Sequence, residues 1–280
     1  MPKTTLVILL LLSMAFSALA GAEGGEIPFH FSDGFICFEA RVTPTGEPLY
    51  FLLDSGAGVS ALSLRTARRL KVKLGAVESV RGVGSQASAF HIEPLRSAAG
   101  AVALPAIPLA VDLSMADELC SHPIDGLIGV DFFKGRVVQI DYARRCLRFP
   151  GTDAAVSTGE RLPVKFQNGI MCVPVGVNES QPRWTRFDTG CNDALHWVVP
   201  RPQERKERAG VSIGFVTSPN DTALTSVTLG SHAVDKVKTS LHGRALFEGE
   251  AGLLGNELLS RFTVTVDWPN RQIVLGEPSK

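Results

Sequence analysis

The chain contains an internal repeat, and this repeat limits the folds that are open to it. Residues 125–149 (DGLIGVDFFKGRVVQIDYARRCLRF) align without a gap with residues 251–275 (AGLLGNELLSRFTVTVDWPNRQIVL). Each copy has a glycine, two aliphatic residues, a second glycine, two apolar residues, and a strand pattern that ends in an aspartate before a turn and a last strand. A match of this length predicts one structural unit that is present twice.

The repeat extends upstream to a pair of acidic loops. Residues 50–63 (YFLLDSGAGVSALS) align with residues 184–197 (WTRFDTGCNDALHW), and this alignment places Asp188 opposite Asp54. Asp54 stands in an otherwise apolar run, where an unpaired buried charge is costly. The sequence therefore predicts that the two acids are partners, each followed by a hydroxyl residue and a glycine.

The repeat also predicts the domain organisation. Most segments are short, alternating and rich in Val, Ile, Leu and Phe, with Gly and Pro between them, which is typical of an all-β protein. We expect an N-terminal lobe at residues 26–150 and a C-terminal lobe at residues 164–280, joined by a small, polar linker at residues 151–163. One helix is expected at residues 62–75, capped by Ser63.

Composition excludes some classes of partner. The 280 residues are 45% hydrophobic and carry 28 basic and 28 acidic side chains, enough to bury a core as one large domain or two small ones. A formal net charge of zero, with no basic cluster, gives no field that would attract nucleic acid or anionic lipid. We therefore expect neither as a partner.

The first residues predict export. Residues 1–20 begin with Lys3, continue through an apolar run and end in small residues at Ala18 and Ala20, which is typical of a secretory signal peptide. A membrane anchor is the alternative, but the run is shorter than the roughly 20 apolar residues of a spanning helix. The mature protein is expected to be periplasmic or secreted, with no membrane contact after cleavage.

The cysteines and histidines show no metal-ligand spacing. Five cysteines leave at least one unpaired within the chain, and their spacing does not give a connectivity. No metal and no cofactor are therefore expected. Cys191, which follows the second glycine, is interpreted as a small buried residue in preference to a redox-sensitive thiol.

Two carboxylates brought together suit the hydrolysis of an amide by water. Like charges a few ångströms apart raise one pKa, so that the pair shares a proton and acts as one acid and one base. We predict Asp54 and Asp188 as catalytic residues. Asp141 and Asp267, which recur in both copies, each end a strand before a turn and are expected to bind local backbone.

The residues around the acids have separate predicted roles. The hydroxyls of Ser55 and Thr189 are expected to hydrogen-bond the opposite loop. Gly56 and Gly190 would let backbone approach backbone closely. The later glycines of the repeat would let another segment pack beneath each acidic loop without a side chain in the way. These loop-packing glycines are Gly129 and Gly255.

These motifs resemble the retropepsin-like and pepsin-like aspartic proteases. The resemblance rests on Asp54-Ser55-Gly56-Ala57 and Asp188-Thr189-Gly190, each followed by an aliphatic-aliphatic-glycine element, and it covers nearly the whole first half. It implies two β-barrel-like lobes related by a pseudo-twofold axis, a few short helices, and a cleft between the lobes. It further implies an aspartic endopeptidase that acts on peptide or protein substrates as a monomer, with a homodimer as the alternative.

The resemblance also implies a flap over each loop. The candidates are residues 81–88 (RGVGSQAS) and residues 211–218 (VSIGFVTS), although glycine-rich hairpins are also ordinary turns. The candidate flap residues are Gly82, Val83, Gly84 and Gly214. An inactive relative that binds extended peptides by β-addition is the alternative function.

The second loop departs from the family pattern. Arg186 stands where the first loop has Leu52, and Cys191 stands where it has Ala57. Arg186 would lower the pKa of Asp188 if it turned inward, or it would extend its charged end to solvent. The sequence leaves both arrangements open.

Overall fold

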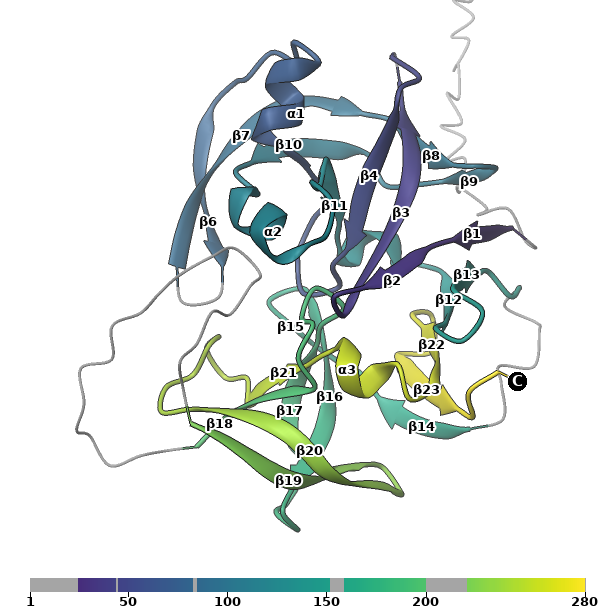
Figure 1. The fold of residues 1–280 in the computed structure, drawn as a ribbon, viewed down its shortest axis with the longest axis vertical. Helices are drawn as coiled ribbons and strands as arrows, with labels where there is room; N and C mark the ends of the chain where they lie inside the picture. The colour runs from purple at the N-terminus through teal and green to yellow at the C-terminus, as the bar shows by residue number, and fades with distance from the viewer. Residues whose placement is uncertain (1–24, 44, 83–84, 152–158, 200–220, 280) are drawn as a thin grey trace, which may run out of the picture.

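The computed structural model describes residues 25–43, 45–82, 85–151, 159–199 and 221–279 (Figure 1). The predicted signal peptide at residues 1–20 lies outside this range. Strands dominate the described chain, and its helices are short. The expected all-β fold with two lobes is confirmed: the first lobe lies at the top of Figure 1 and the second at the bottom.

The N-terminal lobe contains a ten-stranded sheet in the order β6-β7-β10-β5-β11-β4-β3-β8-β9, with β2 paired to β3. Its strands are β2 (His30–Ser32), β3 (Phe35–Val42), β4 (Pro48–Leu53), β5 (Ala61–Ser63), β6 (Val77–Gly82), β7 (Ser85–Leu95), β8 (Ser97–Ala99), β9 (Val102–Ala103), β10 (Ile107–Val111) and β11 (Gly126–Ile128). Its helices are α1 (Leu64–Arg69), α2 (Ser114–Leu119) and the 3-10 helix η1 (Val130–Phe132).

The C-terminal lobe contains a seven-stranded sheet in the order β15-β16-β17-β21-β18-β20-β19. Because β16 pairs with β19 as well as with β17, this sheet closes into a barrel. Its strands are β15 (Lys165–Gln167), β16 (Ile170–Val177), β17 (Arg183–Phe187), β18 (Leu195–Val198), β19 (Thr222–Leu229), β20 (His232–His242) and β21 (Gly252–Leu254), and its helix is α3 (Asn256–Leu259).

A third, six-stranded sheet is shared by the two lobes. Its order is β1-β13-β12-β22-β23-β14, so two strands lie on each side of the central pair β12 and β22. The strands are β1 (Glu26–Pro28), β12 (Val137–Asp141), β13 (Cys146–Arg148), β14 (Glu160–Pro163), β22 (Thr263–Asp267) and β23 (Gln272–Gly276). At its centre β12 and β22 pair antiparallel, which places equivalent segments of the repeat against each other.

The structure confirms the repeat in detail. The first copy forms β11, η1, β12 and β13, and the second forms β21, α3, β22 and β23. Equivalent hydrogen bonds hold the start of each copy: the amide of Asp125 donates to the Tyr50 carbonyl, and that of Ala251 to the Trp184 carbonyl, both at 2.8 Å. The two lobes therefore share backbone geometry as well as sequence pattern.

The aspartates at the ends of β12 and β22 bind local backbone, as predicted. Asp141 Oδ1 accepts the amide of Arg144 at 2.9 Å, and Asp267 Oδ1 accepts the amide of Asn270 at 3.1 Å. Both aspartates are fully buried. They stabilise the turns that follow these strands.

The helix predicted at residues 62–75 is shorter than expected. Helix α1 covers only Leu64–Arg69, although Ser63 caps it as predicted by accepting the amide of Thr66 at 3.2 Å. Lys71 has a φ of +56°, a left-handed conformation that ends a helix. The apolar spacing in the sequence continues past Lys71, but the helical backbone ends before it.

Part of the predicted linker is a strand. Glu160–Pro163 forms β14 and pairs antiparallel with β23, which attaches the chain to the shared sheet before the second lobe begins. Residues 152–158, the middle of the predicted linker, lie outside the described residues.

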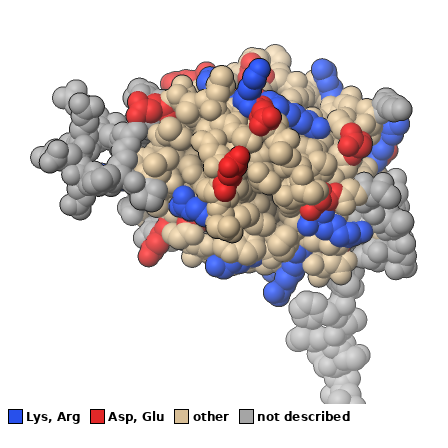
Figure 2. All heavy atoms as spheres, turned by 90° about the horizontal axis from the view of Figure 1, so that it is seen from below, with Lys and Arg blue, Asp and Glu red and all other residues tan. Residues whose placement is uncertain are grey.

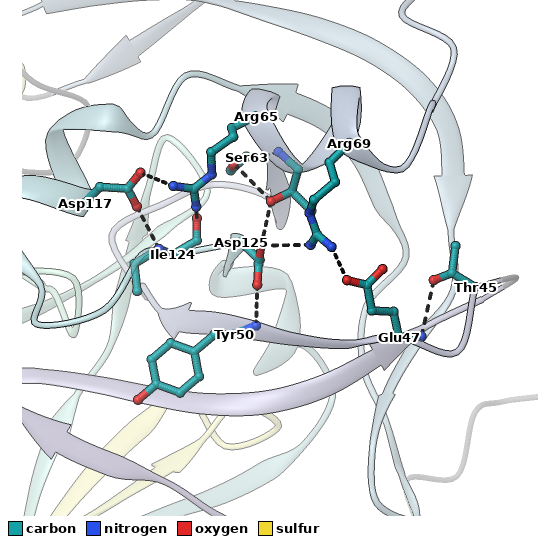
Figure 3. A network of polar contacts seen from close by, with 10 residues as sticks. Thr45, Glu47, Tyr50, Ser63, Arg65, Arg69, Asp117, Ile124 and Asp125 are labelled. Atoms are coloured by element: carbon teal, nitrogen blue, oxygen red, sulfur yellow. Dashed lines mark hydrogen bonds and ion pairs between the residues drawn. The ribbon is translucent and has the colours of Figure 1, made fainter.

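A polar network centred on Asp125 fixes α1 against β4 (Figure 3). The Asp125 carboxylate accepts the Tyr50 amide at 3.0 Å, the Thr66 hydroxyl at 2.6 Å and the Arg69 guanidinium at 3.3 Å. Arg69 also pairs with Glu47. The network holds α1 against β4, the strand that leads into the first acidic loop.

The described surface and core fit a globular protein. One apolar core includes Phe51 of β4 and Phe187 of β17, so it runs through both lobes. Basic and acidic side chains are interspersed over the face seen in Figure 2, and neither sign forms a continuous patch there. Among the described residues, no helix has the length and apolar character needed to cross a membrane.

Candidate active site

Two equivalent loops bring Asp54 and Asp188 to the junction of the lobes. Asp54 follows the end of β4, and its amide donates to the Ile128 carbonyl at 2.8 Å. Asp188 follows the end of β17, and its amide donates to the Leu254 carbonyl at 3.0 Å. Each acid is thus positioned by the parallel strand of its own repeat copy.

The hydroxyls of Ser55 and Thr189 connect the two loops, as the sequence predicted. The Thr189 hydroxyl accepts the Ser55 amide at 2.9 Å, and the Ser55 hydroxyl accepts the Thr189 amide at 3.0 Å. Each hydroxyl also donates across the interface, Ser55 to the Phe187 carbonyl at 2.8 Å and Thr189 to the Leu53 carbonyl at 2.9 Å. These four bonds are fully buried and fix the spacing of the acids.

The glycines after the hydroxyl residues make room for the opposite carboxyl group. A Cβ on Gly56 would lie 2.5 Å from the carboxyl carbon of Asp188, and one on Gly190 would lie 2.4 Å from that of Asp54. Real Cβ contacts are never this short. Each carboxyl group therefore packs directly on the glycine of the other loop, and each acid affects the pKa of the other.

The two acids are equally buried but differently hydrogen-bonded. Each is 2% exposed. Asp54 Oδ1 accepts two backbone amides, from Gly56 and Ala57, both at 3.0 Å. Asp188 Oδ1 accepts the amide of Gly190 at 2.9 Å. Among the described contacts Asp54 thus has one more amide donor than Asp188.

Burial raises the pKa of both acids. For Asp188, burial and the negative charge of Asp54 raise the pKa to about 8, against a smaller opposing effect of the nearby Arg186 cation. For Asp54, burial raises the pKa, and the amides of Ala57 and Gly56 and the Arg186 cation oppose the rise. Two adjacent buried acids with raised pKa values suit a pair that shares one proton and acts as a combined acid and base.

The glycines of the repeat pack beneath the loops, as expected. A Cβ on Gly129 would lie 2.7 Å from the Val59 carbonyl carbon, and one on Gly255 would lie 2.2 Å from the Asp193 carbonyl oxygen. The residues that follow are bonded equivalently: the amide of Val130 donates to Ala57, and that of Asn256 to Cys191, both at 2.8 Å.

The first flap candidate lies on a hairpin. Strands β6 and β7 pair from Val77 against Phe90 to Gly82 against Ser85. Gly82 is the last residue of β6, while Val83 and Gly84 lie outside the described residues. The second candidate, residues 211–218 with Gly214, also lies outside the part of the chain that the structure describes.

The cysteines are free thiols in this structure. Burial raises the pKa of Cys191 well above its usual range, which disfavours the reactive thiolate. The interpretation of Cys191 as a small buried residue therefore agrees with its environment. Within the described ranges, no group of three Cys, His, Asp or Glu side chains is arranged to hold a metal ion.

Sequence reasoning missed three buried polar groups near the second loop. Asn256 donates to the Thr189 carbonyl at 2.6 Å and to the Gly34 carbonyl of the other lobe at 2.8 Å. His196 and His242 hydrogen-bond at 2.8 Å, and burial together with His196 lowers the pKa of His242 to about 4.

The third missed group is the ion pair of Arg186 and Glu250, whose partners are 64 residues apart. Arg186 turns inward and is 4% exposed, which decides between the two arrangements that the sequence left open. A local pattern gives no sign of Glu250, because only the pairing of β17 with β21 brings the two residues together.

An all-β protein whose two lobes each contribute an Asp-hydroxyl-Gly loop to one buried junction has the architecture of the aspartic proteases. Residues 39–132 match the family model described as aspartyl protease, and this match supports a likeness of the first lobe to aspartyl proteases of the retropepsin-like type. The matched segment contains Asp54 and ends before the second lobe, so Asp188 lies outside it. The match supports a protease function. A search among curated proteins found no match to the chain.

Proposed function

We propose that this chain is an aspartic endopeptidase that hydrolyses peptide bonds with a water molecule activated by Asp54 and Asp188. The observation that carries the proposal is the reciprocal packing of the two carboxyl groups on the glycines of opposite loops. This packing places two buried acids close together, which favours a shared proton, and each acid comes from a different lobe of the same chain. A monomer therefore contains a complete dyad.

The chemistry follows from the shared proton. The ionised carboxyl group takes a proton from water as the water oxygen bonds to the scissile carbonyl carbon, while the neutral carboxyl group gives its proton to the carbonyl oxygen. The carbon–nitrogen bond then breaks as a proton passes to the leaving amine. The net reaction adds water to an amide and gives an acid and an amine, with no metal or cofactor taking part.

The substrate class follows from the same site. An extended peptide would lie across the two loops, and the β6–β7 hairpin of the first lobe is the candidate cover. Residues 1–20 are proposed to direct export to the periplasm or beyond, which would place the enzyme with extracytoplasmic proteins or peptides. Gly82, Val83, Gly84 and Gly214 remain the flap candidates.

A second candidate function is the binding of extended peptides without cleavage, by addition of a strand to the same site. The resemblance alone does not separate the two functions. What favours the enzyme is that both acids, both hydroxyls and both glycines are present and in contact in the two loops.

The test is digestion of a peptide library over a range of pH by the wild type, Asp54→Asn and Asp188→Asn. Each substitution should abolish cleavage, and a pepstatin-like inhibitor should block the wild type. Asp235→Asn, on the exposed side of β20, is the matched control and should cleave normally. Cleavage that persists in both active-loop variants would refute the mechanism, and peptide binding without any cleavage by the wild type would favour the second candidate.

A further inference from the structure

A buried ion pair lies beside the dyad in the second lobe only. Arg186 Nε donates to Glu250 Oε2 at 2.7 Å, and Nη2 donates to Glu250 Oε1 at 2.8 Å, which is a bidentate arrangement. Both residues are 4% exposed. The guanidinium also lies 3.4 Å from the centre of the Phe247 ring. Its orientation is thus fixed from two sides.

The first lobe has an apolar pair at the equivalent position. The repeat places Leu52 opposite Arg186 and Ile124 opposite Glu250. Both apolar residues are buried and belong to one cluster. The backbone around the two pairs is equivalent, since Leu52 pairs with Leu127 and Arg186 with Leu253. The fold therefore does not require an ion pair at this position.

The remaining nitrogen of the Arg186 guanidinium, Nη1, forms a hydrogen bond with the first lobe. Arg186 Nη1 donates to the Gly56 carbonyl at 2.8 Å. That carbonyl belongs to the same peptide group as the Ala57 amide, which donates to Asp54 Oδ1 at 3.0 Å. One peptide group therefore bridges the cation and the carboxylate. A cation on the carbonyl side polarises the peptide group and strengthens the bond from its amide.

Asp188 has no matching arrangement among the described contacts. Leu52 stands where a second arginine would be. The amides of Ala57 and Cys191 donate to the main-chain carbonyls of Asp54 and Asp188 at 3.1 and 3.2 Å, but among the described contacts only the Ala57 amide also donates to the carboxylate of its acid, at 3.0 Å. The direct field of Arg186 reaches both acids and lowers the pKa of each. Only Asp54 is also reached through a polarised peptide group.

We infer that Arg186, held by Glu250, is a positioning residue that fixes the Gly56–Ala57 peptide and makes Asp54 the ionised member of the dyad, with Asp188 holding the proton. This inference rests on the proposed function for its roles: Asp54 takes the proton from water, and Asp188 protonates the carbonyl oxygen. Arg186 does not touch substrate, because it is enclosed and its three bonded arms are directed at protein atoms.

Other titratable groups facing this pair are two cysteine thiols. Burial raises the pKa of Cys172 on β16 to about 12, and the nearby charges of Glu250 and Arg186 act on it in opposite directions. Burial also raises the pKa of Cys191 well above its usual range. Both thiols stay neutral over the range in which the dyad titrates, so the charges that act there are those of Arg186, Glu250 and the two acids.

The test replaces the ion pair by the apolar pair of the first lobe, in the variant Arg186→Leu/Glu250→Ile. An apolar replacement of a buried ion pair usually folds, whereas removing one partner leaves a buried charge. Arg186→Lys keeps a cation but loses the bidentate fork and serves as the conservative variant. Two readouts are measured for each protein: kcat and KM against pH, and the titration of the Asp54 and Asp188 carboxyl carbons by ¹³C NMR.

The double variant should lose on the order of tenfold in kcat with little change in KM. Both limbs of its pH profile should move up, the acid limb set by Asp54 by about one pH unit and the alkaline limb set by Asp188 by less. In the wild type the pKa of Asp54 should lie below that of Asp188. The difference between the two pKa values should be smaller in the double variant and close to that of the wild type in Arg186→Lys. Unchanged kcat and unchanged limbs in the folded double variant would overturn the inference, as would an Asp188 that titrates first in the wild type.

The NMR titration separates this inference from the proposed function. If the wild type cleaves no peptide but the gap between the two acids narrows as expected, the assignment of the ionised acid stands and the protease proposal fails. If peptides are cleaved but the gap is the same in wild type and double variant, the inference fails and the protease proposal stands.

Discussion

Ser55 and Thr189 exchange hydrogen bonds across the two lobes, each hydroxyl accepting the backbone amide of the other residue, at 2.9 and 3.0 Å. Each hydroxyl then donates to the carbonyl that directly precedes the opposite acid. Neither lobe can shift relative to the other without breaking this set of bonds. The spacing of Asp54 and Asp188 therefore depends on two side chains that do no chemistry themselves.

Replacing either hydroxyl should loosen the dyad. Ser55→Ala or Thr189→Val removes one donor and leaves a buried amide and a buried carbonyl without their partner, so the free energy of unfolding should fall by about 1–3 kcal/mol. Because the carboxyl groups would no longer be held in register, kcat should fall at least tenfold. Chemical denaturation and peptide cleavage measure the two effects.

Two controls accompany this prediction. Thr189→Ser keeps the hydroxyl and should keep most of the activity. Thr225→Val breaks a buried hydroxyl pair with Thr239, bonded at 2.7 Å in the same lobe, and should cost stability without a matching loss of kcat. If Thr225→Val lowered kcat as much as Thr189→Val, the cross-loop bonds would have no special role in positioning the acids.

Adding a methyl group to the glycine of either loop should abolish activity. In Gly56→Ala the new Cβ would lie 2.5 Å from the carboxyl carbon and both oxygens of Asp188, and Gly190→Ala would crowd Asp54 in the same way. The carboxyl groups would have to move apart, so they could no longer share a proton. We expect a loss of at least a hundredfold in kcat/KM, measured on the peptides cleaved by the wild type.

Gly58→Ala is the matched control for the glycine prediction. It lies in the same loop as Gly56, but an added Cβ has no heavy atom within 4 Å. Activity close to that of the wild type is expected. Equal losses in Gly58→Ala and Gly56→Ala would mean that the loop needs glycine for flexibility and that the close carboxyl packing is not the cause.

The internal repeat made the main features of this site predictable. It paired Asp54 with Asp188 and gave both hydroxyls and both packing glycines, because each of these residues is adjacent in sequence to an acid or to a repeat element. The predicted length of α1 was wrong, because the left-handed conformation of Lys71 ends the helix although the apolar spacing in the sequence continues. The partner of Arg186 was not predictable, because Glu250 has no equivalent acid in the first copy.

The pH dependence of cleavage should be bell-shaped, with the alkaline limb set by Asp188. The reaction needs Asp188 protonated and Asp54 ionised. Since burial and Asp54 raise the pKa of Asp188 to about 8, activity should fall as pH rises through about 8. Burial raises the pKa of Asp54 against the opposing effects of its two amides and Arg186, so the acid limb should lie above the usual aspartate range near 4.

The measurement is kcat/KM for one cleaved peptide in overlapping buffers at constant ionic strength. His242, whose pKa is lowered to about 4 by burial and by His196, should not contribute to the alkaline limb, and His242→Gln should leave that limb in place. Activity that stays constant to about two units above pH 8 would contradict the assignment of Asp188 as the proton donor.

Stability should fall as pH rises from about 4 to about 8 because of the same proton. In the unfolded chain Asp188 titrates near its ordinary pKa of about 4, whereas in the folded chain its pKa is raised to about 8. Between these values the folded state holds a proton that the unfolded state has released, so each unit of pH costs up to about 1.4 kcal/mol of unfolding free energy. Above about pH 8 both states are ionised, and the effect stops growing.

Asp188→Asn removes this proton, so the difference in unfolding free energy between variant and wild type reports on the pair of acids and not on the groups outside it. His242 acts in the opposite sense, since its lowered pKa makes the unfolded state bind more protons between about pH 4 and 6.5, but it is common to both proteins and cancels. Urea unfolding at several pH values from 5 to 7.5 should show that the unfolding free energy of the variant increases relative to that of the wild type at each higher pH. A difference that stays constant over this range, as expected for the exposed control Asp235→Asn, would mean that Asp188 is already ionised in the folded protein.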